Sequence, residues 1–153
     1  MSWQEYESMY ERAQRNNKAP YKTFVLDVVG SKKISREARH QLQDKLMLVE
    51  KLMRRDFYDV IVFDDRCPIN GIVDGDGFAF TFLAGTVSED QFLNVFVYYL
   101  SHQGISQAFH FASANVETVH WAEGGNLYYD GYAIAKLLQD KQMKRRTIYV
   151  ESC

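Results

Sequence analysis

Apolar side chains along this chain change between helical and strand periodicity, and the changes divide it into elements. A spacing of three and four residues predicts helices over residues 2–15, from Ser35 to about Arg55, over 88–104 and over 131–141. Runs rich in Phe, Val and Ile predict strands over 21–29, 107–119 and 147–151. Residues 58–63 are open to two interpretations, a short strand, which we favour, or a continuation of the preceding helix. Two short strand-like runs within 69–83 flank the tetrad Asp74-Gly75-Asp76-Gly77, which predicts a tight hairpin.

The order of these elements predicts an α+β fold. After the first helix come a strand, a helix, a hairpin, a helix and a strand, as in the split βαββαβ arrangement of ferredoxin-like domains. Residues 1–19 are interpreted as an extra N-terminal helical extension, and residues 20–153 as one domain. In this arrangement the first strand and the central hairpin are neighbours in a sheet that carries helices on one side.

The hairpin is the first candidate site. Asp74 and Asp76 bring two carboxylates to the edge of the sheet, and Asp27 adds another near the end of the first strand. Mg²⁺ is commonly bound through one or two carboxylates together with the phosphates of a substrate. The structural alternative is that Asp-Gly forms a good turn and that Asp27 caps the following loop. We therefore predict that Asp27, Asp74 and Asp76 bind a divalent cation, with turn formation as the alternative.

The segment after the first strand is a candidate for phosphate binding. Gly30-Ser31-Lys32-Lys33 combines a glycine, backbone amides and two ammonium groups directly before a helix. Backbone amides at such a place can bind phosphate. The spacing of the Walker A loop, Gly-x-x-x-x-Gly-Lys, is absent from this segment, so that class of site is excluded.

Composition narrows the function classes. The 153 residues are 46% apolar and 14% aromatic, which is enough for one compact domain, and a net charge of −2 predicts no nucleic-acid partner. Cys67 and Cys153 are too few for a disulfide framework or a zinc site. His110 and His120 have no Cys or His at metal spacing and are predicted to be ordinary strand histidines. Without an apolar run near 18 residues, we expect no membrane partner and a soluble, cytoplasmic protein.

Three segments resemble the catalytic domain of class III nucleotide cyclases. Residues 24–31, Phe-Val-Leu-Asp-Val-Val-Gly-Ser, are similar to the Asp-Ile-Val-Gly-Ser segment that opens that domain. Residues 72–79, Ile-Val-Asp-Gly-Asp-Gly-Phe-Ala, are similar to its Gly-Asp hairpin and more distantly to the GGDEF hairpin of diguanylate cyclases. Residues 129–135 resemble its Tyr-x-Gly-x-x-Val-Asn segment. The first segment and the later Gly-Asp also look like the small SatD-type proteins.

The resemblance implies a cyclase-type (palm-type) fold and a mechanism. Asp27 and Asp76 would hold two divalent ions, Mg²⁺ or Mn²⁺, one promoting deprotonation of the 3′-hydroxyl and the other binding the triphosphate. The residues implied to contact phosphate are Val28, Val29, Gly30, Ser31 and Lys32. A nucleoside triphosphate is the implied substrate, with a cyclic nucleotide and pyrophosphate as products. A homodimer is also implied, because the sites of the family form between subunits.

Several positions depart from the family pattern. Counting from Gly131, the transition-state Asn and Arg of the family fall at Ala135 and Gln139. The Lys and Asp that read adenine fall near Ile72 and Tyr128. Loss of one transition-state stabiliser commonly costs about 10²–10³ in rate. Two hypotheses therefore stay open: an active nucleotidyl cyclase (a phosphorus-oxygen lyase), or a catalytically inactive cyclase-fold module that binds a nucleotide or a protein.

Overall fold

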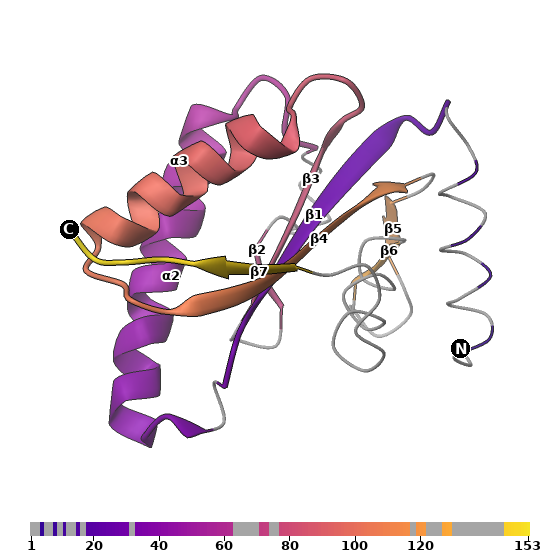
Figure 1. Cartoon of the computed structure of the whole chain (residues 1–153). Helices are drawn as coiled ribbons and strands as arrows, with labels where there is room; N and C mark the ends of the chain where they lie inside the picture. The colour runs from indigo at the N-terminus through magenta and orange to yellow at the C-terminus, as the bar shows by residue number, and fades with distance from the viewer. Residues whose placement is uncertain are drawn as a thin grey trace.

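The structure is a computed structural model that describes residues 4, 8, 11, 15, 18–30, 33–62, 71–73, 77–116, 119–121, 127–129 and 146–153. For 71–73, 77–79, 116, 119–121 and 127–129 it describes the backbone alone. The helices are α2 (Arg36–Asp56) and α3 (Glu89–His102) (Figure 1). The strands are β1 (Tyr21–Val28), β2 (Gly71–Val73), β3 (Gly77–Leu83), β4 (Ala108–Val116), β5 (Val119–Trp121), β6 (Leu127–Tyr129) and β7 (Arg146–Tyr149).

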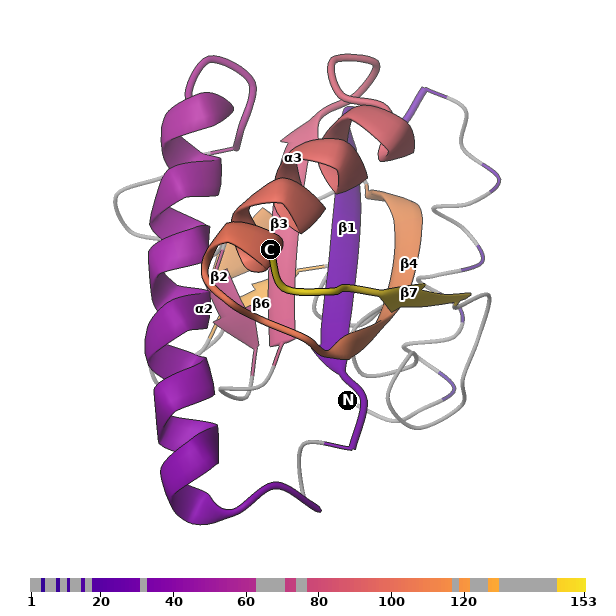
Figure 2. The same ribbon diagram turned by 60° about the vertical axis from the view of Figure 1, so that its left-hand side comes forward.

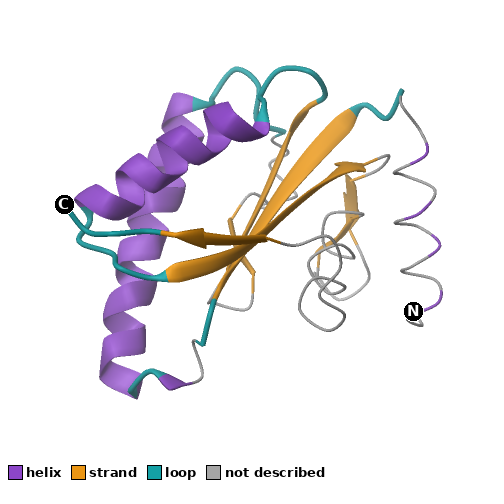
Figure 3. Ribbon diagram, viewed as in Figure 1, coloured by secondary structure: helices purple, strands orange, loops and turns teal. Residues whose placement is uncertain are grey.

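The strands form one large antiparallel sheet and one small one (Figure 3). The large sheet has five strands in the order β2-β3-β1-β4-β7, and β5 pairs with β6 in the second. The first strand of the fold, β1, lies in the middle and pairs antiparallel with both β3 and β4. The predicted α+β class and the predicted neighbourhood of the first strand and the hairpin are both confirmed.

Both helices lie on one face of the large sheet (Figures 1 and 2). Because side chains alternate along a strand, every second residue of β1, β3 and β4 points to these helices. Aromatic rings fill most of that space, and Phe92 of α3 stacks on Phe24 of β1 with 4.6 Å between ring centroids. The fully buried side chains of this core include Phe24, Phe80, Phe82, Phe92, Phe96, Phe109, Phe111, Leu46, Met53 and Leu100.

The opposite face of the sheet carries small and polar side chains. Thr23 of β1 and Thr81 of β3 are completely buried, and their hydroxyls are hydrogen bonded at 2.8 Å. Val25, Ala112 and Ala114 share this face and are also buried. In Figure 1 the small β5–β6 sheet lies on this side, away from the helices. Both faces of the central strands are therefore covered.

The helices begin and pack as their sequences predict. Ser35 caps α2, and the stripe Leu46, Val49 and Met53 is completely buried against the sheet. Ser88 and Gln91 form the predicted capping box at the start of α3. Near the other end of α2, the Tyr99 hydroxyl donates to Asp56 and accepts from Arg55 at 3.0 Å. The hydrogen bond to Asp56 raises the pKa of Tyr99.

Some predictions differ from the structure or lie outside the described residues. The strand predicted over 58–63 is wrong for its described part, because a turn follows α2 and only Ile61 forms an isolated bridge, to Phe82. The strand predicted over 107–119 is divided between β4 and β5. The N-terminal extension over 1–19, apart from residues 4, 8, 11, 15, 18 and 19, and the helix over 131–141 lie outside the described residues. Among the residues that are described, no helix has the length and apolar character needed to cross a membrane.

Candidate functional site at the end of the central strand

Asp27 lies near the carboxyl end of the central strand, on the face opposite the helices. Its neighbours across the sheet are Gly77 of β3 and His110 of β4. Asp27 is half-buried, whereas Val28, which points to the helices, is buried. Partial exposure lowers the desolvation cost that a carboxylate would face in a buried strand. The Asp27 carboxylate is therefore partly accessible to solvent at the edge of the sheet.

The hairpin strands end beside Asp27. Val73, the last residue of β2, pairs with Gly77, the first residue of β3, and Gly77 is in turn opposite Asp27. Asp74 and Asp76 themselves lie outside the described residues. Asp76 directly precedes Gly77 in the chain, and Gly77 is the cross-strand neighbour of Asp27.

His110 is a candidate residue that the sequence analysis set aside as an ordinary strand histidine. The antiparallel register puts it directly opposite Asp27. Directly opposed side chains in such a pair have Cβ atoms roughly 4.5–5.5 Å apart, so the imidazole is within reach of the carboxylate. The Nδ1 atom of His110 is buried. Alternation in β4 predicts the face on which His110 lies, but only the pairing register shows that it opposes Asp27.

Two backbone groups of the predicted phosphate-binding segment, the Val29 amide and the Gly30 carbonyl, already form hydrogen bonds within the chain. The Val29 amide donates to the Ala108 carbonyl at 2.9 Å, which extends the β1–β4 ladder beyond Val28. Gly30 has φ of 71°, and its carbonyl accepts from the Lys33 amide at 2.9 Å, which closes a turn. Ser31 and Lys32 lie outside the described residues. The Val29 amide is therefore occupied by the sheet, and the phosphate contacts predicted for Val28, Gly30, Ser31 and Lys32 stay predictions.

The two positions implied for base reading belong to different sheets. Ile72 lies in β2, the edge strand of the large sheet, opposite Phe78. Tyr128 lies in β6 of the small sheet, opposite His120. The structure describes the backbone alone at both positions.

The donor set at this end of the sheet fits a hard cation only in part. Carboxylate oxygen is a ligand that Mg²⁺ and Mn²⁺ accept, and Asp27 supplies it at a half-buried strand end. Within the described ranges, however, no three His, Cys, Asp or Glu side chains form a group that could hold a metal ion. A metal site here therefore needs carboxylates from residues 74–76.

Comparisons with known proteins provide no relative from which the role of this site could be inferred. No model of a known protein family matches the chain, and neither the curated proteins nor the solved structures include a significant match.

Proposed function

We propose that this chain is a ferredoxin-like, cyclase-type domain that binds a nucleoside triphosphate and a divalent cation at the end of β1. The single observation that carries this proposal is the register of Asp27 with Gly77, the residue that follows Asp76. A hydrolysis or transfer site built on two carboxylates needs them close together, although they are far apart in the chain. The strand order β2-β3-β1-β4, which is the order of a ferredoxin-like sheet, supports the same proposal.

The proposed roles follow from the residue types. Asp27 and Asp76 are the ligands of Mg²⁺ or Mn²⁺, and Asp74 is a further carboxylate of the same turn. A bound cation would neutralise triphosphate charge and favour loss of the proton from the attacking hydroxyl. His110 is a positioning residue in this scheme, because a neighbouring imidazole can hold the Asp27 carboxylate by a hydrogen bond.

A catalytically inactive module is the second candidate function. Ala135 and Gln139 stand where the resemblance implies an Asn and an Arg that stabilise the transition state. A site that keeps its carboxylates but lacks these groups would bind a nucleotide without turning it over. Incubation of the purified chain with each of the four nucleoside triphosphates and Mn²⁺ separates the two candidates. A cyclic product with pyrophosphate supports the enzyme, and binding without product supports the module.

The binding part of the proposal has its own test. Two carboxylates at one site repel each other when no cation is bound. Mn²⁺ with a nucleoside triphosphate should therefore raise the melting temperature of the wild type, and Asp27→Asn or Asp76→Asn should abolish that rise. Without ligand, Asp76→Asn should be as stable as the wild type or slightly more stable.

Asp59→Asn is the matched control, because Asp59 is an exposed carboxylate in the turn after α2. It should respond to ligand as the wild type does. A variant at Asp76 that melts lower without ligand and responds normally to Mn²⁺ and nucleotide would identify a turn residue instead of a metal ligand.

A homodimer completes the proposal, because shared sites are what the resemblance implies. Light scattering over a range of concentrations measures this directly. A monomer at high concentration would contradict catalysis at a shared site and would leave nucleotide binding to be decided by the melting curves.

A further inference from the structure

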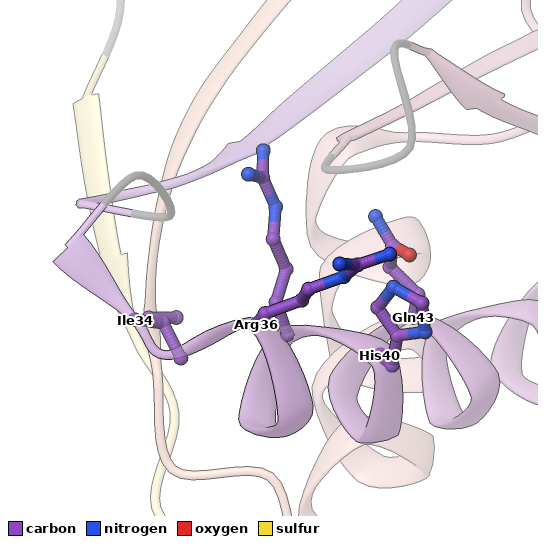
Figure 4. A pocket seen from close by; sticks show the side chains of 5 residues that line it. Ile34, Arg36, His40 and Gln43 are labelled. Carbon is purple, nitrogen blue, oxygen red and sulfur yellow. The ribbon is translucent and has the colours of Figure 1, made fainter.

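A solvent-open cavity of about 410 Å³ lies along the first two turns of α2. Its lining consists of Ile34, Arg36, Arg39, His40 and Gln43. The four helical positions follow the spacing i, i+3, i+4 and i+7, which is one face of a helix. Figure 4 shows Arg36, His40 and Gln43 projecting from the same side of the helix, with Ile34 preceding them. Small-ligand pockets have volumes of roughly 300–1,000 Å³, so the cavity is large enough for a small ligand.

The lining is strongly biased in charge. Arg36 and Arg39 are always cationic, His40 offers ring nitrogens for hydrogen bonds, and none of the five lining residues is acidic. The whole chain, in contrast, has a net charge of −2. No described residue forms an ion pair with Arg36. A local excess of positive charge on an acidic protein indicates a multiply charged anionic ligand.

This arrangement works against the stability of the helix that carries it. Cations in the first turns of a helix oppose its dipole, and like charges at a spacing of three or four residues repel each other. Arg36 and Arg39 meet both conditions. A local cost of this kind, at a place where the chain forms a cavity, is typical of a binding site.

The chemistry of the lining matches phosphate. The planar guanidinium group presents paired N–H donors that match the spacing of phosphate oxygens. Two guanidinium groups together balance a charge larger than that of a single carboxylate. The side-chain amide of Gln43 adds a neutral donor on the same face.

The cavity also lies close in the chain to the proposed site. Only residues 29–35 separate the end of β1 from the start of α2. In Figure 2 the carboxyl end of β1 and the first turns of α2 lie at the same, lower end of the molecule. A ligand that reaches Asp27 could therefore extend toward Arg36, Arg39 and His40, the basic face of α2.

We propose that Arg36, Arg39 and His40 bind the phosphate groups of a polyphosphorylated ligand, independently of a divalent cation. The identification of that ligand as a nucleoside triphosphate rests on the proposed function, whereas the site itself rests on the cavity and its side chains. In an active enzyme these guanidinium groups would provide positive charge that Gln139 does not.

Calorimetric titration of the full chain with tripolyphosphate, at physiological ionic strength and with EDTA present, tests this site without metal or base. Wild type should bind, and Arg36→Gln/Arg39→Gln should weaken binding at least about tenfold. The double variant should fold, because Arg36 is exposed and Arg39 is only partly buried, and circular dichroism can verify its helix content. Lys51→Gln removes one charge from an exposed position of the same helix outside the cavity and should change affinity less than about twofold.

Further arms separate this inference from the proposed function. The double variant should lower the affinity for ATP in EDTA as much as it lowers the affinity for tripolyphosphate. Adenosine, which has no phosphate, should not bind at Arg36 and Arg39. Asp27→Asn should abolish the Mn²⁺-dependent rise in melting temperature, and Asp59→Asn, at an exposed position outside both sites, should leave binding of tripolyphosphate unchanged. A further result is a wild type that shows no Mn²⁺-dependent rise in melting temperature, together with a double variant whose affinity for tripolyphosphate is lower than that of the wild type. That result would contradict the proposed function and support the phosphate site on α2.

Three results would overturn the inference. The first is a wild type that does not bind tripolyphosphate. The second is a double variant that binds it as tightly as the wild type does. The third is an equal loss in Lys51→Gln, which would indicate attraction to the charge of the whole helix instead of a site.

Discussion

α2 and α3 pack on the same face of one sheet, yet their first turns are built differently. At α3, the Ser88 hydroxyl accepts from the Gln91 amide at 3.1 Å, and the Gln91 side chain accepts from the Ser88 amide at 3.0 Å. At α2, the Ser35 hydroxyl accepts from the Ala38 amide at 3.3 Å, and Ala38 cannot return a bond. The start of α3 therefore satisfies two backbone donors reciprocally, whereas the start of α2 satisfies one.

The charges at these two starts also differ. The first turn of α3 carries Glu89 and Asp90, which favour the positive end of the helix dipole. Glu89 also accepts from the Ser113 hydroxyl and pairs with Arg146 at 3.5 Å, which ties the helix to β4 and β7. The first turns of α2 have one acidic residue, Glu37, beside the basic residues of the cavity. The charges at the start of α3 therefore favour the stability of that helix, whereas the start of α2 carries the basic residues of the proposed phosphate site.

The largest expected effect concerns how firmly α3 is held. Phe92 packs against Phe24, Phe80, Phe82, Phe96 and Phe111, and it is completely buried. Phe92→Ala should destabilise the chain by about 3–5 kcal/mol, because it removes a ring and leaves a cavity. Urea unfolding followed by circular dichroism measures the change. Asn94→Ala, at an exposed position of α3, should change stability by less than about 0.5 kcal/mol.

The next largest effect on the free energy of unfolding is expected from the N-cap residues of the two helices. Ser88→Ala should cost about 1 kcal/mol, because it leaves an amide of the first turn without its acceptor. Ser35→Ala should cost less, since its single bond is longer and has no reciprocal partner. Unfolding midpoints of the two variants in one buffer measure the difference. An equal or larger loss at Ser35 would contradict the comparison between the two helix starts.

Charge exchange at the first helical residue sharpens the comparison further. Arg36→Glu should stabilise the ligand-free chain by about 0.3–1 kcal/mol, because it replaces a cation with an anion near the positive end of α2. Glu89→Lys should have the opposite sign. Both effects should shrink as salt is added, since the interactions are near the surface. The same Arg36→Glu variant should lose affinity for tripolyphosphate, so stability and binding would change in opposite directions.

The smallest expected effect is a pH dependence within α2. Burial raises the pKa of Glu50 above its ordinary value of 4.5, and Arg54, which pairs with it at 2.9 Å, partly offsets that rise. A raised carboxyl pKa stabilises the folded state below pH 4.5, and this contribution is lost as the pH rises through the folded value. Glu50→Gln should therefore gain more stability relative to wild type at pH 7 than at pH 4. Urea midpoints that differ equally at both pH values would be inconsistent with this expectation.

Local sequence alone predicted most of the elements that the structure describes. Ser88 and Gln91 mark the start of α3, and the apolar stripe through Leu46, Val49 and Met53 marks the buried side of α2. These predictions succeed because hydrogen bonds of a cap and the periodicity of a helix depend on residues a few positions apart. The strand predicted over 58–63 fails for the opposite reason. Residues 60–62 make two backbone hydrogen bonds to β3 around the Ile61–Phe82 bridge, but Ile61 donates its own amide to Phe57 in the turn, so no longer ladder forms over the described part.

The tertiary structure decided what lies around Asp27. The sequence showed a carboxylate at the end of a buried strand, but pairing register alone brings Gly77 and His110 to either side of it. The start of α2 had a local signal, since Arg36, Arg39 and His40 all fall within five residues of the cap Ser35, but only the structure shows that they line one cavity with Ile34 and Gln43. Local propensity acts over a few residues, whereas a site is made by contacts between strands and helices that are far apart in the chain.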